Sequence, residues 1–379
     1  MAVRLAEGPA GVTDVLRVIA RHEPVASKEI ARRTELPVPI VAAVCSELRK
    51  RGVVDRTRPA RLTAAGRAGM AALGGADTGR ITGRCPCCQG NGATIPDALA
   101  GVLPALERIA AEMPAAKLDL DQTHCTADTK LRRVLRMHEA GALAGQRVLM
   151  LGDDDMVSVA LAAVAAELGP GFRPRRLAVV DCDRDLLGHL GGVLDGLGLP
   201  ADVVEHDLRE PLPGPLAGAF DAVSTDPPYT VAGAELFLSR AVTALAGGGA
   251  GYIFLSYGAR RPEETLATQR LMAAMGLTVR SLVPGFNTYT GAGILGGTSH
   301  LYELRATAGS QAMITGAYRG PLYSAASRAV PARPYRCALC GAIHPVGPGA
   351  RWPRIADLKM AGCPDCGGTV FRPQPLARR

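Results

Sequence analysis

Aspartates end four consecutive segments in the middle of the chain, and each segment has the apolar character of a buried strand. The acids are Asp153, Asp154 and Asp155 after 147–152, Asp181 at the end of 176–181, Asp207 at the end of 201–207 and Asp226 within 220–229. In a doubly wound sheet the carboxyl ends of the strands border the ligand site. Helix capping explains one such acid but not four, so we expect a single acidic site.

Each of the later acids has a separate predicted task. An acid ending the second strand can accept both ribose hydroxyls of an adenosine-containing ligand, so Asp181 is a candidate donor-binding residue. Asp207 stands, by fold analogy, where such enzymes meet the adenine amino group. Asp226-Pro227-Pro228-Tyr229 resembles the motif of enzymes that alkylate amino groups. There Asp226 and the Pro227 carbonyl would accept hydrogen bonds from the attacking nitrogen, and Tyr229 would offer it a cation–π surface.

The loop after the first strand distinguishes between classes of ligand. Dinucleotide enzymes place a glycine-rich loop here, whose amides and helix N-terminus bind phosphate. In this chain Gly152 is followed by three aspartates. An anion about 4 Å from one of them would be repelled by roughly 4 kcal/mol at an effective dielectric constant of about 20. Decarboxylated S-adenosylmethionine and a polyamine carry ammonium groups instead. We expect Gly152 and Asp153 to contact that donor and Asp154 to anchor the polyamine.

Two C-x-x-C pairs near the C-terminus have the spacing of a metal site. Cys337 and Cys340 are separated from Cys363 and Cys366 by 22 residues. Four thiolates bind Zn²⁺ tetrahedrally and leave no open position, so a structural zinc ribbon is predicted. A further cluster, Cys85, Cys87 and Cys88, supplies too few ligands alone. It is consistent either with part of a metal site or with reduced thiols in a tight turn.

Alternating strands and helices from residue 147 predict the scaffold for the acids. Besides the strands above, we expect strands at 247–258, 277–284 and 299–305. Helices are expected at 97–112, 129–140, 156–168, 185–198, 234–245 and 262–275. Apolar strands alternating with amphipathic helices are typical of a parallel sheet covered on both faces. The fold class is therefore α/β, a Rossmann-like doubly wound sheet of the S-adenosylmethionine-dependent transferase type.

The chain of 379 residues is long enough for additional domains. Helical patterns at 12–22, 27–34 and 37–50, followed by short wing strands, predict an N-terminal winged helix. It would serve either for DNA binding or as an interaction module. The expected organisation is a winged-helix domain (1–73), a linker with helices (74–146), the catalytic domain (147–308) and a C-terminal segment with the zinc ribbon (309–379).

Charge is distributed unevenly along the chain. Residues 1–84 hold 15 Lys or Arg against 8 Asp or Glu, residues 148–230 hold 5 against 14, and residues 330–379 hold 8 against 2. The acidic middle argues against a uniform nucleic-acid surface and favours a cationic ligand. No run of about 18 apolar residues predicts a membrane span. The N-terminus lacks a signal-peptide pattern, so a cytoplasmic location is expected.

Several segments together resemble the branched-chain polyamine synthase family, the bis(aminopropyl)spermidine synthases. They are VLMLGDDDMVSVALA, DPPYT, GGTSHLYEL (296–304) and the stretch 118–138, with the winged-helix start and C-x-x-C-x-G-x-G. The resemblance covers roughly residues 10–305, and the C-terminal zinc ribbon departs from it. It implies transfer of an aminopropyl group from decarboxylated S-adenosylmethionine to an amine of spermidine, with release of methylthioadenosine.

The resemblance also implies roles for individual residues. The last acid of G-D-D-D, here Asp155, would accept the proton of the attacking amine, helped by Asp226. His300 lies in the GGTSH segment and is a candidate for substrate binding. A homodimer is the family's expectation. The acceptor amine and the number of transfers are left open.

Two other functions are consistent with parts of the sequence. A nucleic-acid N-methyltransferase would explain D-P-P-Y and the winged helix, although the acidic loop disfavours it. A polyamine-sensing DNA-binding regulator would use the winged helix together with an inactive core. Nucleic acid is therefore an open but less favoured partner.

Overall fold

The computed structural model describes residues 8–34, 36–72, 90, 92–247, 251–258, 261–290, 297–323, 333–346, 351–352 and 355–374. The chain divides into two compact units, Met1–Gly320 and Pro321–Arg379. Cys85, Cys87 and Cys88 lie outside the described residues. No helix among the described residues has the length and apolar character needed to cross a membrane. The predicted boundaries after residues 73, 146 and 308 stay predictions.

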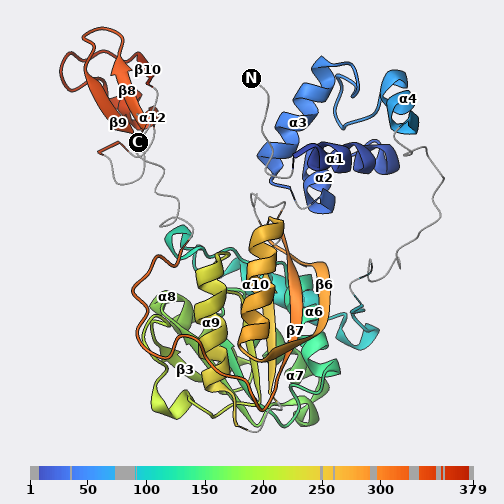
Figure 1. Ribbon diagram of the computed structural model, residues 1–379. Helices are drawn as coiled ribbons and strands as arrows, with labels where there is room; N and C mark the ends of the chain where they lie inside the picture. The colour runs from blue at the N-terminus through green and yellow to red at the C-terminus, as the bar shows by residue number, and fades with distance from the viewer. Residues whose placement is uncertain are drawn as a thin grey trace. The chain divides into compact units, whose positions relative to one another are not determined.

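The N-terminal part is a winged helix, drawn in blue in Figure 1. Its helices are α1 (Gly8–His22), α2 (Ser27–Thr34), α3 (Val38–Lys50) and α4 (Ala64–Ala72). Apolar side chains at helical spacing form its core, among them Val15, Ile19, Ile30, Val41 and Leu48. Single antiparallel bridges join Val25 to Ala60 and Val54 to Leu62, so the wing is closed by isolated bridges and not by full strands.

The central part of the chain is built on a seven-stranded sheet with the order β3-β2-β1-β4-β5-β7-β6. Its strands are β1 (Arg147–Leu151), β2 (Arg176–Asp181), β3 (Asp202–Glu205), β4 (Ala222–Thr225), β5 (Tyr252–Tyr257), β6 (Leu277–Thr288) and β7 (Thr298–Ala306). The first five are parallel. The central strands are buried almost throughout, as expected for a sheet covered on both faces.

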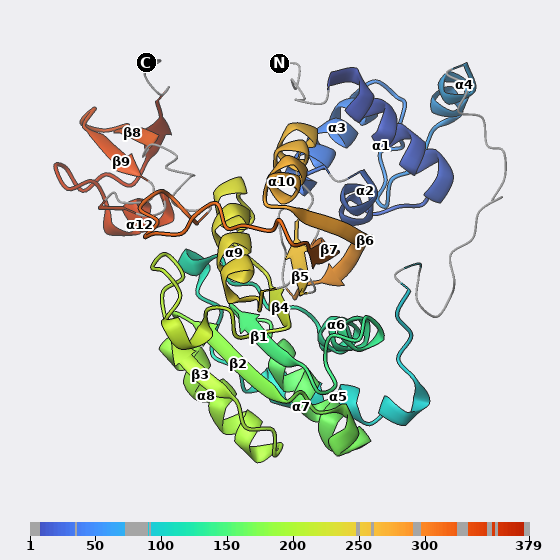
Figure 2. The ribbon, with the colours of Figure 1, turned by 60° about the horizontal axis from the view of Figure 1, so that its bottom comes forward.

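Helices cover both faces of this sheet (Figures 1 and 2). One layer contains α5 (Val102–Ala111), α6 (Ala127–Glu139), α7 (Val157–Leu168) and α8 (Arg184–Gly196), whose apolar side chains share one core with β1 and β2. The other contains α9 (Val231–Ala244) and α10 (Pro262–Ala274). Short 3-10 helices are η1 (Asp97–Leu99), η2 (Leu118–Leu120), η3 (Pro170–Phe172) and η4 (Gly214–Leu216).

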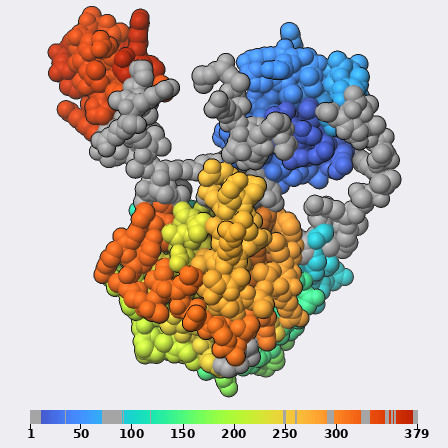
Figure 3. Space-filling model, viewed as in Figure 1, coloured from blue at the N-terminus to red at the C-terminus, as the bar shows by residue number. Residues whose placement is uncertain are grey.

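The segment that follows β7 runs back over α9, as the orange surface of Figure 3 shows. The buried guanidinium of Arg240 donates hydrogen bonds to the carbonyls of Ile314 and Gly316, at 2.8 and 2.7 Å. The amide of Tyr318 donates to the Arg209 carbonyl at 2.7 Å. These hydrogen bonds attach residues 307–318 to the side of the sheet covered by α9, so they belong to the same compact unit as the sheet.

The last two strands differ from the predicted parallel sheet. β7 pairs antiparallel with both β5 and β6. Parallel neighbours need a long crossover connection, usually a helix, and β6 and β7 are joined by a segment too short to hold one. The other strands and helices predicted between residues 129 and 305 overlap their predicted ranges, whereas the helix predicted at 97–112 is divided into η1 and α5, and the wing strands are single bridges.

The strand register brings the predicted acidic loops to one edge. Leu151, the last residue of β1, pairs with Val180 of β2 and with Thr225 of β4. The chain therefore leaves all three strands at the same level. Gly152 and Asp226 come directly after β1 and β4, and Asp181 is the last residue of β2. The strand register therefore brings these three residues close together.

The C-terminal unit is a small antiparallel sheet with the order β10-β8-β9. Its elements are β8 (Arg333–Cys337), β9 (Ile343–Val346), α12 (Ile355–Ala361) and β10 (Phe371–Pro373). Cys337, Val346, Leu358, Cys363 and Phe371 form its buried cluster. Besides two of the cysteines, this cluster holds three apolar side chains among the described residues, and so small a core is typical of domains that need a metal for stability.

Candidate functional site

The loop after β1 begins with a backbone turn that requires glycine. Gly152 has a φ of +70°, and a Cβ there would stand 3.5 Å from the Phe237 ring. Asp153 then caps α7, because its two carboxylate oxygens accept hydrogen bonds from the amides of Val157 (2.8 Å) and Ser158 (3.2 Å). Burial raises the pKa of Asp153 to about 7 in spite of these bonds. The Asp153 carboxylate is thus directed at the helix.

Asp155 lies in a different environment, two residues further along. Its carboxylate accepts a 2.7 Å ion pair from Arg133 of α6 and a 2.6 Å hydrogen bond from the Cys125 amide. The Lys130 ammonium donates to the Asp155 carbonyl at 2.7 Å. Burial alone would raise the pKa of Asp155, but the charges of Arg133 and Lys130 hold it at about 2. Asp155 is therefore ionised.

Asp226, at the end of β4, shares the same guanidinium. Arg133 Nη2 stands 3.0 Å from Asp226 Oδ2, and the Tyr289 hydroxyl donates to that oxygen at 2.6 Å. Burial raises the pKa of Asp226 to about 7, opposed by Arg133 and reinforced by the negative charge of Asp155. Asp155 and Asp226 therefore form a carboxyl pair that takes up one proton as the pH falls through about 7.

A buried polar network extends from this pair to β6 and β7. The Tyr229 hydroxyl donates to the Tyr289 hydroxyl at 2.7 Å, and Tyr289 and Ser299 hydroxyls are 2.8 Å apart. Asn287 accepts from Arg133 Nε at 2.8 Å and donates to Ser299 at 2.8 Å. Burial raises the pKa values of Tyr229 and Tyr289 far above the usual range, so both phenols stay neutral. These hydrogen bonds connect Asp226 to α6, β6 and β7.

Asp154 is the member of the acidic loop that keeps some solvent exposure. The Thr123 amide donates to its carboxylate at 3.2 Å. Burial raises the pKa of Asp154 strongly, and the negative charges of Asp155, Asp226 and Asp181 raise it further. A cationic ligand beside it would relieve this repulsion. The position therefore suits an ammonium group.

Residues 117–126, which we name the edge strap, cross the carboxyl edge of the sheet. At one end Lys117 and Gln122 bind the Asp183 carboxylate, at 2.6 and 3.0 Å. At the other end the Thr126 amide donates to the Thr288 carbonyl at 2.8 Å. Between these ends lie the amides that bind Asp154 and Asp155. The edge strap thus links the loops after β1 and β2 to β6.

The two predicted donor-binding acids differ in exposure. Asp181 is 8% exposed and accepts hydrogen bonds from the amides of Asp153 (3.2 Å) and Asp183 (2.9 Å), while burial raises its pKa. Asp207 is half-buried and pairs with Arg209 at 2.6 Å; the hydrogen bonds from Arg209 outweigh its partial burial and lower its pKa. Asp181 is the last residue of β2, and Asp207 lies two residues after the end of β3.

The remaining predicted residues lie on the β4, β5 and β7 side of the site. Pro227 is buried beside Asp226, and the Tyr229 and Tyr257 rings meet edge to face at 5.5 Å. His300 joins the network through its carbonyl, which accepts from Asn287 at 3.2 Å. Its ring nitrogen Nδ1 accepts instead from the Gly285 amide at 3.1 Å.

Sequence reasoning missed the residues that hold the acids in place. They are Lys130, Arg133, Asn287, Tyr289 and Ser299. One signal was present in α6, where Lys130 and Arg133 are three residues apart and therefore on one face of the helix. Both are buried. Because Lys and Arg are almost never fully buried unless paired, a cationic helix face next to an acidic domain indicates buried partners.

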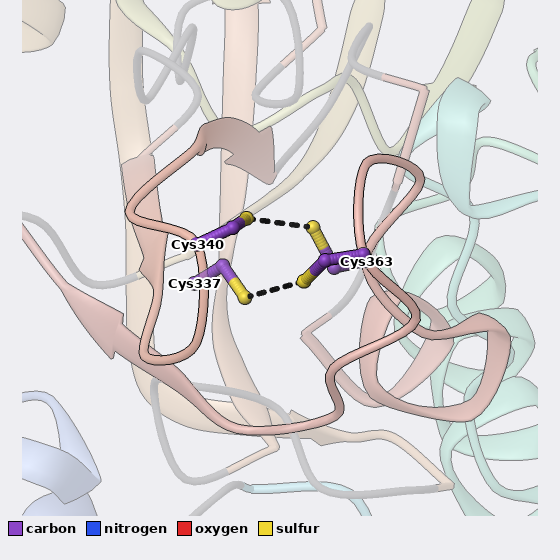
Figure 4. A group of neighbouring side chains, drawn as sticks. Cys337, Cys340 and Cys363 are labelled. Carbon is purple, nitrogen blue, oxygen red and sulfur yellow. Dashed lines mark hydrogen bonds between the residues drawn. The ribbon is translucent and has the colours of Figure 1, made fainter.

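The sulfur atoms of Cys337, Cys340, Cys363 and Cys366 all lie within 4.8 Å of one another. Figure 4 shows the first three of these residues. Sγ distances are 3.6 Å between Cys337 and Cys366 and 3.7 Å between Cys340 and Cys363. A disulfide would need about 2.05 Å. Four sulfurs at about 2.3 Å from a tetrahedral Zn²⁺ stand about 3.8 Å apart. The described geometry therefore fits a four-thiolate metal site.

The strand order defines a mixed α/β domain of the methyltransferase-like type. Residues 101–308 match the model described as the branched-chain polyamine synthase A C-terminal domain, and residues 9–61 match the MarR family. The chain belongs to the branched-chain polyamine synthase family. With the MarR-type winged helix and the four-cysteine cluster, the predicted fold class and family resemblance are confirmed.

Relatives with high coverage fall into two groups. An uncharacterized protein of Methanocaldococcus jannaschii is 35% identical over 97% of this chain and 89% of its own. The N(4)-bis(aminopropyl)spermidine synthases of Thermococcus kodakarensis and M. jannaschii are 32% and 30% identical. They match 68% and 69% of this chain, and 71% and 73% of their own.

One solved structure has the same fold over most of the chain. It is the branched-chain polyamine synthase from Thermus thermophilus in complex with N4-aminopropylspermidine and 5'-methylthioadenosine. The TM-score is 0.65 at 24% identity, and the match covers 83% of this chain and 92% of that one. The likeness supports the fold.

Proposed function

We propose that this protein is an aminopropyltransferase. It would move an aminopropyl group from decarboxylated S-adenosylmethionine to a secondary or tertiary amine of a polyamine such as spermidine, giving a branched polyamine and methylthioadenosine. The observation that carries the proposal is the acidic edge formed by Asp154, Asp155 and Asp226 in a member of this family. The names of the relatives support the same reaction class.

The proposed reaction is a direct displacement. The amine nitrogen attacks the propyl carbon next to the sulfonium, a C–N bond forms, and the C–S electron pair returns to sulfur, giving neutral methylthioadenosine. With a secondary amine, the proton lost by nitrogen passes to the Asp155–Asp226 pair. A tertiary amine has no proton to lose once it is neutral, and its product keeps a fixed charge. Holding donor and amine together lowers the entropic barrier.

Binding roles follow the strand ends. Gly152, Asp153, Asp181 and Asp207 are assigned to the donor side, with Asp181 at the ribose and Asp207 at the adenine. Asp154 would anchor an outer ammonium of the polyamine. Pro227, Tyr229 and His300 are assigned to the acceptor side, where a tyrosine face can stabilise a developing ammonium. A homodimer, expected from the family, would be checked by light scattering.

We also propose that Cys337, Cys340, Cys363 and Cys366 hold a structural Zn²⁺. The four sulfurs converge with spacings that fit tetrahedral coordination. The ion would crosslink the β8 turn and the turn after α12. It has no proposed part in the transfer.

The deciding experiment is incubation of the full chain with decarboxylated S-adenosylmethionine and a panel of amines, read by mass spectrometry. The expected result is addition of one or two aminopropyl units to spermidine or a related amine, with equimolar methylthioadenosine. Ordinary S-adenosylmethionine with labelled methyl is the matched control. Methyl transfer to nucleic acid without aminopropyl transfer would replace this proposal with the methyltransferase alternative.

Nucleic-acid binding by the winged helix is a second candidate function. The observation that favours it is the wing, where Arg51, Arg56, Arg58 and Arg61 are all exposed. Fluorescence anisotropy with a short duplex would test it. Replacing Arg56 and Arg58 by Ala should weaken binding and flatten the salt slope by about 0.9 per lost phosphate contact. Arg17→Ala, in an exposed ion pair with Asp14, is the control.

A further inference from the structure

We propose that Arg133 is a positioning residue for the transfer. Its guanidinium ties the carboxylates of Asp155 and Asp226 together, so that Asp155 stays ionised and Asp226 receives the proton that a secondary acceptor amine loses. The inference rests on the proposed function, because it concerns the same site. It adds a residue on α6 that sequence reasoning assigned no role, and it divides the work between the two acids.

All three guanidinium nitrogens of Arg133 donate hydrogen bonds. Nε donates to Asn287 at 2.8 Å, Nη1 to Asp155 at 2.7 Å, and Nη2 to both Asp226 and Tyr289 at 3.0 Å. The side chain is 4% exposed. A planar fork with fixed donors holds two carboxylates in a defined orientation, which a flexible lysine ammonium does not. The distance between the two acids is therefore set from α6.

One cation between two buried acids leaves one negative charge in excess when both are ionised. The pair lowers its energy by taking up one proton, and the surroundings decide which acid takes it. Asp155 receives the Cys125 amide at 2.6 Å and lies near the Lys130 ammonium. Asp226 receives hydrogen bonds from Arg133 and the neutral Tyr289 hydroxyl, and its side-chain hydrogen bond to Asp155 favours the protonated form of Asp226. The proton therefore belongs to Asp226.

The other ionisable groups around the pair lead to the same result. Burial and the charges of Asp155 and Asp226 raise the pKa of Asp154, on the loop after β1, so this side chain favours its neutral form. Cys125 of the edge strap is neutral because burial raises the pKa of its thiol. Tyr229 and Tyr289 are neutral phenols. Arg133 and Lys130 of α6 are thus the cations that face the pair among the described residues.

An ionised Asp155 beside a proton-accepting Asp226 suits an amine substrate. A carboxylate with a very low pKa binds an ammonium group but does not remove its proton, whereas an acceptor that titrates near the working pH does so efficiently. Without Arg133 both acids would become weaker acids and the pair would stay protonated at neutral pH. Arg133 thus keeps the pKa values of Asp155 and Asp226 low enough for the pair to accept a proton near neutral pH.

The test compares Arg133→Lys and Arg133→Gln with wild type in the pH dependence of kcat/KM for decarboxylated S-adenosylmethionine and spermidine. In the Gln variant the acidic midpoint should rise by at least one pH unit. Lys keeps the charge and should restore most of the midpoint but not the full rate. The matched control is Arg132→Gln on the same helix, whose ion pair is with Asp128. It should leave the midpoint unchanged.

A lower rate with an unchanged midpoint in Arg133→Gln would overturn the inference, because a merely structural role predicts that result. Should that variant not fold, Tyr289→Phe replaces it. This change removes the hydrogen bond to Asp226 without removing a buried charge, so the midpoint should rise by several tenths of a pH unit. An unchanged midpoint there would count equally against the inference.

Infrared titration of the carboxyl band separates this inference from the proposed function. In wild type, a buried carboxyl should lose its proton near pH 7, and Asp226→Asn should remove that signal while Asp155→Asn should shift it. This result needs no turnover. An enzyme inactive with every amine but showing this titration would contradict only the proposed function. Active enzyme without the titration would contradict only the inference.

Discussion

Asp153, Asp154 and Asp155 are adjacent in the chain but meet three different environments. Asp153 caps a helix, Asp154 keeps some exposure beside the edge strap, and Asp155 is ion-paired with Arg133. Left-handed backbone at Met156, with a φ of 52°, lets the chain turn from the loop into α7. Identical residue types therefore receive different pKa values and different tasks, as burial and nearby charges dictate.

The first prediction concerns pH. Burial raises the pKa of Asp226 to about 7, so its proton-accepting form is populated only above that pH. For spermidine, kcat/KM should fall roughly tenfold per pH unit as the pH drops below about 7, and protonation of the substrate amine steepens the fall. The measurement is a pH–rate profile from pH 5.5 to 9. A flat profile between pH 5.5 and 7 would contradict the role given to Asp226.

The second prediction separates the acids by substitution. Asp155→Asn and Asp226→Asn should each lower kcat by about 10²–10⁴-fold, the usual contribution of a positioned acid or base. Donor affinity, measured by calorimetry, should fall only modestly. Asp185→Asn is the matched control, since that side chain is 71% exposed and pairs with Lys117. Full activity of Asp155→Asn would remove Asp155 from the mechanism.

At the scale of elements, the edge strap and α6 act together on the loop after β1. The strap contributes amide donors to Asp154 and Asp155, and α6 contributes Arg133 and Lys130. Thr126 joins the two, because its side chain caps α6 by accepting the Thr129 amide at 3.2 Å. The start of α6 therefore sets where its two cations lie.

The third prediction tests this cap. Thr126→Ala should lower the free energy of unfolding by about 1 kcal/mol, the typical cost of losing an N-cap side chain. Thr126→Ser keeps the hydroxyl and should stay close to wild type. Urea unfolding followed by circular dichroism measures both. Equal stability of the Ala and wild-type proteins would show that the cap contributes nothing.

The same elements show what could be predicted from the sequence. Apolar strands ending in acids located Asp181, Asp207 and Asp226, because strand ends in a parallel sheet are local features. The partnership of Arg133 with Asn287 joins residues 154 positions apart. No local pattern carries such a contact, since it depends on β6 returning antiparallel beside β7.

Adjacent acids posed a similar difficulty. Nothing in G-D-D-D distinguishes the helix cap from the ion-paired acid, since all three side chains are alike. The difference arises from the direction in which α7 leaves the loop and from the donors of the edge strap. The four C-terminal cysteines were easier to interpret, because metal-ligand spacing is itself a local signal.

At the scale of the whole molecule, the chain combines an acidic middle segment with basic segments at both ends. Its similarity to an uncharacterized M. jannaschii protein extends over 97% of its length, whereas the M. jannaschii synthase matches 69%. The family model ends at residue 308. The C-terminal unit therefore lies wholly outside the residues that the family model matches.

The last prediction concerns this unit. Among the described residues its buried cluster holds three apolar side chains besides two of the cysteines, so we expect metal binding to supply much of its folding free energy. Purified protein should contain one zinc per chain by elemental analysis, and Cys363→Ser should lose most of it. The Cys182→Ser variant, with its exposed cysteine in the central part of the chain, is the control. Because residues 1–320 form a separate compact unit, their thermal unfolding should be unchanged in Cys363→Ser, while protease should cut after residue 320. Retention of zinc, or loss of the main unfolding transition, would contradict a structural metal confined to this unit.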